Sequence, residues 1–239
     1  MDTILIVVTI GSFLASFVNA AFATGGVYIL LAASSSVLPL SAAVPLQSAF
    51  AFGSLIARIA YFRKFIHWRI VGVFLTGGIF GVIVGTKVFV SLPESVMSMT
   101  IGVVLIVLIW FPVSGWRFPF RYPFFPIGIV HAFLGTTFGV GAILQPAMLR
   151  TNLKKLEITG TLAACLVLLD VMKVTGYVSS GFRYQDFLPH IILATLAGFA
   201  GTWSGKRISH RISERLFRTA FKWLITAVAF RLVFKGLTL

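Results

Sequence analysis

The sequence predicts an all-α polytopic membrane protein made of two inverted repeats, each a short re-entrant or broken helix pair followed by three transmembrane helices. The first reason is composition. Of 239 residues, 58% are apolar and 11% are charged, whereas a soluble domain is about 25% charged. The other two reasons are a series of hydrophobic segments that occurs twice, and loop charges that differ between equivalent positions. Open sheets are excluded in lipid, because unpaired backbone N–H and C=O groups cost several kcal/mol each there.

Each half of the chain contains five hydrophobic segments, and the longer ones match the ~20 residues that a helix needs to cross a bilayer. In the first half they lie near residues 3–18, 27–38, 43–62, 70–91 and 97–113, and in the second near 123–135, 139–149, 156–178, 187–207 and 215–236. In both halves the first two segments are too short to span separately, so we expect them to pair. The predicted domains are therefore a first repeat at 1–113, a cytoplasmic linker at 114–122 and a second repeat at 123–239.

The glycines of the two fourth segments support the repeat. They recur at a constant offset of 120 residues, with Gly78, Gly81 and Gly85 corresponding to Gly198, Gly201 and Gly205. An acid, Glu94 or Glu214, lies nine residues beyond the last glycine of each trio. We predict that these glycines allow close helix packing. Internal repeats of this kind are typical of secondary transporters.

Loop charge predicts that the halves are inverted. Residues 58–69 hold four bases and no acid, while the equivalent loop holds only Arg183 and Asp186. The next loop reverses the comparison, because residues 206–218 hold five bases against one acid. Under the positive-inside rule these equivalent loops lie on opposite sides. The prediction is six crossings plus two re-entrant hairpins; fused short pairs would instead give eight crossings and parallel halves.

The formal charge of +14 favours lipid over nucleic acid as a partner. The bases lie in short loops between apolar segments, as in cytoplasmic anchoring at anionic headgroups. We therefore expect a multi-pass protein of the inner (cytoplasmic) membrane with no nucleic-acid partner. The sequence does not fix the oligomeric state, and a homo-oligomer is one alternative. Arg231 and Lys235 near the C-terminus do not fit the inverted topology, which places them outside.

Two glycine-containing breaks, at residues 19–26 and 135–141, are the candidate binding site. A helix N-terminus there would offer free N–H groups and a positive dipole end to an anion at the membrane midplane. The third segment of each half adds polar residues. The candidate substrate-binding residues are Asn19, Thr24, Gly25, Gly26, Gln47, Ser48, Thr136, Thr137, Gly139, Gly141 and Thr161. The alternative is that the glycines serve packing and the hydroxyl groups bond within their own helices.

Ionisable residues within apolar segments are candidates for a proton or charge relay. Asp170 and Lys173 lie three apart on one helical face and can neutralise each other. His131 lies beside the second break. The alternatives are that Lys173 snorkels to the outer membrane surface and that His131 is a packed neutral side chain. The sequence shows no HExxH, CxxC, GxSxG or Walker A pattern, so we expect no enzyme activity, cofactor or metal.

Short motifs along nearly the whole chain resemble the sulfite exporter TauE/SafE family, also called the 4-toluene sulfonate uptake permeases. They are ATGGVYILLA, YFRKFIHWR and GGIFGVIVG in the first half, and FGVGAILQPAML, ITGTLAA and AGFAGTWSGKRISHRISERL in the second. The first motif departs from the family, which often has more glycines and a following Pro. The resemblance implies transport of a small sulfur-containing anion such as sulfite or a sulfonate. An alternative is a membrane subunit that recruits a partner protein through residues 206–218.

Overall fold

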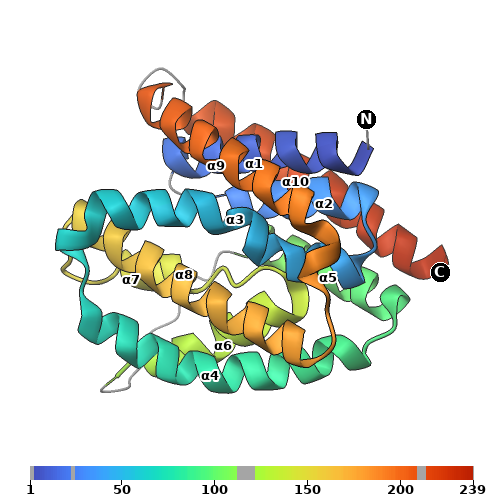
Figure 1. The fold of residues 1–239 in the computed structure, drawn as a ribbon, viewed down its shortest axis with the longest axis horizontal. Coiled ribbons are helices and arrows are strands. Elements are labelled where there is room, and N and C mark those ends of the chain that lie inside the picture. The colour runs from blue at the N-terminus through green and yellow to red at the C-terminus, as the bar shows by residue number, and fades with distance from the viewer. Residues whose placement is uncertain (1–2, 23–24, 112–121, 209–213, 239) are drawn as a thin grey trace. The chain divides into compact units, whose positions relative to one another are not determined.

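The computed structural model describes residues 3–22, 25–111, 122–208 and 214–238, which form helices and no strand. The α-helices are α1 Thr3–Phe22, α2 Gly26–Val37, α3 Leu40–Phe62, α4 Trp68–Ser91, α5 Glu94–Trp110, α6 Phe124–Phe138, α7 Leu144–Met148, α8 Lys155–Ser179, α9 Leu188–Ile208 and α10 Glu214–Thr238 (Figure 1). Each corresponds to one predicted hydrophobic segment. The predicted all-α class is confirmed.

One predicted length is wrong. The hydropathy pattern ends the first segment near residue 18, too short to span, but α1 continues to Phe22 and has 20 residues. The polar residue Asn19 lies inside the helix rather than at its end. Its side chain is satisfied there, because the Gly26 N–H donates to Asn19 Oδ1 at 3.1 Å. Asn19 thus stays within α1, and its oxygen bonds the backbone of the next helix rather than that of its own.

Five helices of the described residues are long and apolar enough to cross a membrane. They are Thr3–Phe22, Leu40–Phe65, Trp68–Ser91, Lys155–Ser179 and Tyr184–Arg207. Helix α5 has 17 residues, near the lower limit for a span, and α10 carries Lys222, Arg231 and Lys235 along its length. The polytopic membrane class is confirmed, and the inverted topology stays a prediction.

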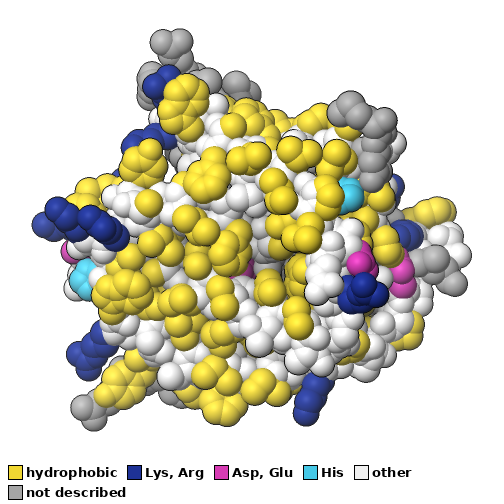
Figure 2. Space-filling model, viewed as in Figure 1, with side chains coloured by type: hydrophobic (Ala, Val, Ile, Leu, Met, Phe, Trp, Pro, Cys, Tyr) yellow, Lys and Arg dark blue, Asp and Glu magenta, His cyan; other side chains and the backbone are white. Residues whose placement is uncertain are grey.

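Large apolar side chains cover the outside of several helices. On α4, Ile79, Phe80, Ile83 and Val84 are each 47–57% exposed, and apolar groups spread over much of the face in Figure 2. Contiguous apolar surface of this kind is rare on soluble monomers. It is the surface that lipid would cover.

The chain forms two compact units, and each takes segments from both halves of the sequence. Unit 1 comprises Met1–Ser54, Leu92–Phe111 and Arg183–Leu239, and unit 2 comprises Leu55–Ser91 and Pro112–Phe182. The predicted repeats at 1–113 and 123–239 do not coincide with these units, because each unit combines segments of both repeats. The division into repeats therefore stays a prediction, and most of the predicted linker lies outside the described residues.

The glycine trios serve helix packing, as predicted. In unit 1, α1 lies beside α9 (Figure 1), and a methyl group at Gly201 would overlap the Phe13 carbonyl. In unit 2, α4 lies beside α6, and a methyl group at Gly81 would overlap the Ile129 carbonyl. Without a side chain at these positions the backbones approach closely.

The same contact thus occurs once in each unit, and each time it joins helices from different halves. Helix α1 of the first half packs on α9 of the second, and α6 of the second half packs on α4 of the first. A third such pair is α5 with α10, where Ser98 Oγ donates to the Leu232 carbonyl at 2.8 Å. These matched contacts support the proposal of two related halves.

Candidate functional site

The first break lies in unit 1 between α1 and α2. Gly25 has φ +98°, a left-handed conformation that favours glycine. Gly26 follows it as the first residue of α2, and a methyl group there would overlap the Ala15 carbonyl and the Asn19 side chain. Asn19 therefore caps the start of α2 through its bond to the Gly26 N–H. Thr24, also predicted here, lies outside the described residues.

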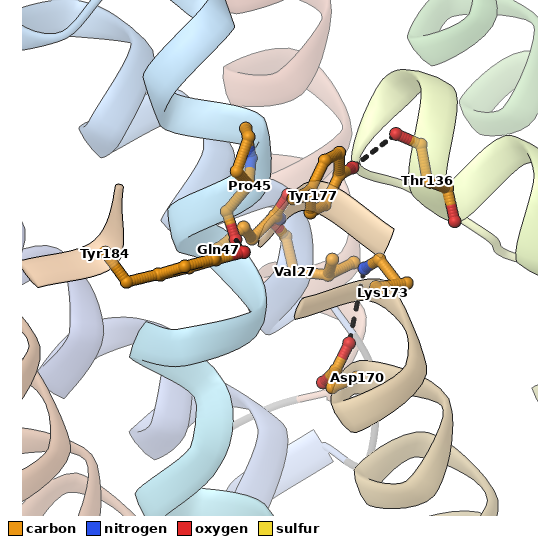
Figure 3. Close-up of polar contacts among 8 residues, drawn as sticks. All are labelled: Val27, Pro45, Gln47, Thr136, Asp170, Lys173, Tyr177 and Tyr184. Carbon is orange, nitrogen blue, oxygen red and sulfur yellow. Dashed lines mark hydrogen bonds and ion pairs between the residues drawn. The ribbon is translucent and has the colours of Figure 1, made fainter. Parts of the chain in front are cut away.

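Helix α3 brings a buried amide to the same place in unit 1. Gln47 is 3% exposed, and its Nε2 donates to the Val27 carbonyl in the first turn of α2 at 2.7 Å (Figure 3). Its Oε1 is buried and has no hydrogen-bond partner among the described residues. Ser48 follows it and is also buried. The structure thus brings Asn19, Gly26 and Gln47 together around the start of α2.

The second break lies in unit 2 between α6 and α7. Gly139 and Ala142 both have positive φ, at +77° and +51°, and α7 has five residues. Leu144 N–H, at the start of α7, donates to His131 Nδ1 at 3.2 Å. This hydrogen bond places the ring proton of a neutral His131 on Nε2. A methyl group at Gly141 would overlap the same ring.

His131 therefore holds the second break in shape. Its side chain is 8% exposed and meets Phe74 edge to face, with ring centroids 5.7 Å apart. This arrangement matches the alternative in which His131 is a packed side chain. Its role as a proton relay stays a prediction.

Two threonines at the end of α6 are buried in unit 2. Thr137 Oγ1 donates to the Gly85 carbonyl of α4 at 3.3 Å. Thr136 Oγ1 has no hydrogen-bond partner among the described residues, and neither has Thr86 Oγ1 on α4. A buried hydroxyl without a partner costs about 1–3 kcal/mol. The two hydroxyl groups are therefore available to an acceptor that enters this part of the unit.

A buried ion pair lies on α8 in the same unit. Lys173 Nζ lies 3.2 Å from Asp170 Oδ1, and the two residues are 6% and 9% exposed. This burial contradicts the alternative in which Lys173 snorkels to the membrane surface. One turn further along, Tyr177 OH donates to the Thr136 carbonyl (Figure 3). Charges buried in a membrane helix are costly, and they commonly mark a substrate or ion pathway.

Thr161 lies apart from that group. Its Oγ1 accepts from the His67 N–H at 3.0 Å, just before α4 begins. Twelve residues of α8, about 18 Å of helix, separate Thr161 from Lys173. The hydroxyl thus caps a neighbouring helix, and the structure does not bring it to the buried ion pair.

Sequence reasoning missed Thr86 and Tyr177 as members of the unit 2 group. Thr86 directly follows a predicted packing glycine, and Tyr177 lies four residues after Lys173 on the same helical face. These two sequence positions could have indicated that both residues lie near the predicted site. Among the described residues no three His, Cys, Asp or Glu side chains are placed to hold a metal ion.

A family model described as sulfite exporter TauE/SafE matches residues 8–232. Comparisons with curated proteins and with solved structures gave no match. The family match implies a membrane transporter with an anionic small-molecule substrate, and it is consistent with a protein that is not an enzyme.

Proposed function

The chain belongs to the sulfite exporter TauE/SafE family, and on that basis we propose that it moves a small sulfur-containing anion, such as sulfite or a sulfonate. It acts as a secondary transporter or facilitator in the inner (cytoplasmic) membrane. The family membership supports a multi-pass membrane transporter. The particular anion and the residues that bind it are our proposal.

The observation that carries the proposal is the buried pair of Lys173 and Asp170. A lysine that is 6% exposed keeps its charge in a membrane helix only with an anionic partner. A substrate anion has the same charge as Asp170, so it can take the place of Asp170 beside Lys173 while Asp170 takes up a proton. The proton balances the charge, because an ionised Asp170 left without its partner would be costly. When the substrate leaves, Asp170 loses the proton and pairs with Lys173 again.

The hydroxyl groups of unit 2 fit the same substrate. An oxyanion only accepts hydrogen bonds, and Thr86 and Thr136 each hold a buried hydroxyl without a partner among the described residues. Tyr177, on the same face of α8 as Lys173, already donates its hydroxyl proton to the Thr136 carbonyl, so it holds the end of α6 beside this group. Charge-assisted hydrogen bonds from the two threonines to an oxyanion are stronger than neutral ones. We propose Thr86, Thr136 and Lys173 as the polar lining in unit 2.

Unit 1 holds a second proposed group at the start of α2. The N-terminus of this 12-residue helix carries a partial positive charge, and the side chains of Asn19 and Gln47 lie beside it. Gln47 Oε1, buried without a partner in the described part of the chain, can only accept a hydrogen bond, so it suits a donor rather than an oxyanion. We propose that Asn19, Gly25, Gly26, Gln47 and Ser48 line a polar site within unit 1.

The decisive experiment is flux of labelled sulfite and of a labelled sulfonate into proteoliposomes. We expect Lys173→Met to lower flux at least tenfold. Because the single change leaves Asp170 buried without its partner, the double variant D170N/K173M tests the same loss in a neutral interior. Lys87→Met is the matched control, since Lys87 is an exposed lysine of α4 in the same unit.

Two results would count against the proposal. If the double variant transports as well as the wild type, Lys173 is not the substrate's charge partner. If the wild type gives no flux above empty vesicles for either anion, the proposed substrate class is wrong. The family match lends no support to the alternative of a scaffolding subunit, and part of its predicted contact, residues 206–218, lies outside the described residues.

A further inference from the structure

Unit 1 contains a cavity of about 380 Å³ that none of the proposed transport residues lines. It lies where α2 ends, α5 begins and α10 runs through its last turns. Its lining includes Ser35, Ser36 and Leu38 from the end of α2 and the residues after it, together with Glu94 and residues of α10.

The charges around this cavity do not cancel. Glu94 Oε1 lies 3.1 Å from Lys235 Nζ, and the two form an ion pair. The same oxygen lies 3.4 Å from the backbone nitrogen of Leu40, which opens α3. Arg231, one turn before Lys235 on α10, is exposed and forms no ion pair with a described residue. One positive charge therefore remains for a ligand.

The cavity lies beside the last turns of α10. Arg231 and Lys235 lie seven and three residues before Thr238, the last described residue. A bound anion would give a reason for two bases that do not fit the predicted topology.

The size and the mixed lining indicate what the ligand is. A water molecule occupies about 30 Å³ of liquid, so the cavity has room for a ligand the size of about a dozen waters and is large for a bare inorganic oxyanion. Besides the charged groups, Val228 and Leu232 add apolar surface. A ligand that fills this space needs both an anionic head and an apolar stem.

We propose that this cavity binds an amphiphilic oxyanion, in which a tetrahedral phosphate or sulfonate head sits against Arg231 and an apolar stem packs on Val228 and Leu232. The head has two sources, the phosphate of a membrane lipid or a free alkyl sulfonate. Glu94 tunes the site, because its carboxylate holds Lys235 away from the head. The inference does not rest on the proposed function, since Lys173 belongs to unit 2.

The test is equilibrium binding to the full-length protein in a neutral detergent. Hexane-1-sulfonate and methanesulfonate are titrated by calorimetry, and bound phosphatidylglycerol is counted by native mass spectrometry. We expect Arg231→Gln to weaken binding about ten- to a hundredfold, as for a lost charge-assisted hydrogen bond. Arg183→Gln is the control, because Arg183 is an exposed base of unit 1 outside the cavity, and it should change binding by less than about twofold.

Glu94→Gln is a second variant whose expected effect cannot come from misfolding. It removes the negative charge and releases Lys235, so we expect the anion to bind several-fold more tightly. A misfolded variant cannot show such a gain. Hexane-1-sulfonate should bind at least tenfold more tightly than methanesulfonate, because its stem is buried. A response to these variants with hexane-1-sulfonate identifies a free anion as the ligand, and a response with phosphatidylglycerol alone identifies a lipid. If neither probe responds to Arg231→Gln or Glu94→Gln, the cavity is not an anion site.

Discussion

The two breaks use the same device with different residues. In each, a side chain on the helix before the break accepts the first N–H of the helix after it. At the first break Asn19 Oδ1 accepts from Gly26 N–H, and at the second His131 Nδ1 accepts from Leu144 N–H. Both links tie the second helix of a pair back onto the first.

The breaks differ in how much chain they use. Seven residues separate the partners of the first link, and thirteen separate those of the second. The helices that follow have 12 and five residues, respectively. A five-residue helix carries little macrodipole, and at both starts one N–H already has an acceptor. Helix ends therefore leave few free N–H groups for an anion, and in our proposal Lys173 supplies the charge partner within unit 2.

The largest effect is expected in a test of topology, which asks whether the two halves, each with its break, have opposite orientations in the membrane. Lys64→Cys, Lys206→Cys and Arg183→Cys, each in a Cys165→Ala background, are treated with a membrane-impermeant maleimide in intact cells. If the halves are inverted, Arg183→Cys is labelled at once, whereas the other two are labelled only after permeabilisation. Cys165 is the single cysteine of the sequence, so its replacement leaves no other thiol to react. Labelling that separates positions 64 and 206 would make the halves parallel.

The second test compares crowding at the two breaks. Gly26→Ala forces a methyl group onto the Ala15 backbone, which cannot move, and Gly141→Ala forces one onto the His131 ring, which can turn. We expect Gly26→Ala to cost about 3 kcal/mol and Gly141→Ala about 1–2 kcal/mol, measured as the fall in Tm of the purified protein. Gly135→Ala is the control, because its nearest new neighbour is 3.8 Å away. Equal losses for all three variants would show that close contacts at these glycines do not determine stability.

The third test removes the acceptor at the second break. His131→Phe keeps an aromatic ring but leaves the buried Leu144 N–H without a partner, so we expect a loss of about 1–3 kcal/mol by thermal unfolding. His131→Asn puts an oxygen near the place of Nδ1 and should recover part of that loss. Flux by His131→Asn at several pH values tests the predicted relay, since a relay would lose its pH dependence. A His131→Phe variant as stable as the wild type would contradict the structural role.

The smallest effect is expected at the first break. Asn19→Leu removes the cap of α2, but the bond it breaks is only partly buried, so the freed Gly26 N–H can reach water. We expect a loss of about 1 kcal/mol, typical of a helix cap, whereas Asn19→Asp keeps an acceptor and should lose less. Thermal melts of the two variants, compared with His131→Phe, rank the two links. A larger loss for Asn19→Leu than for His131→Phe would reverse the ranking.

The helices and the breaks were predictable from the sequence because they depend on local patterns. Hydrophobic runs set the helix lengths, glycines mark the turns at Gly25 and Gly139, and the constant offset of 120 residues predicted the packing role of Gly81 and Gly201. Asn19 shows where such reasoning fails. Its polarity suggested a helix end, but its Oδ1 accepts from Gly26 N–H, seven residues away, and α1 continues past it.

The site depended on contacts that local patterns do not contain. Whether Lys173 reaches the surface depends on the helices packed around α8, and these bury it. Thr86 and Thr136 become candidates for the site only because both hydroxyl groups lack a partner among the described residues of the folded chain. The pairing of helices from different halves could not be predicted either, because hydropathy indicates that a helix is buried and not which helix covers it.

The pairing of helices from different halves has a consequence for how the protein is made. Helix α1 leaves the ribosome among the first residues, but its partner α9 begins at Leu188, 185 residues after Thr3. At roughly 5–20 residues per second, about ten to forty seconds pass before the pair can meet. During that wait the face of α1 that later packs on the glycines of α9 has no such partner. The final arrangement is therefore assembled late. A chain stopped at its midpoint holds only one helix of each pair that joins the two halves.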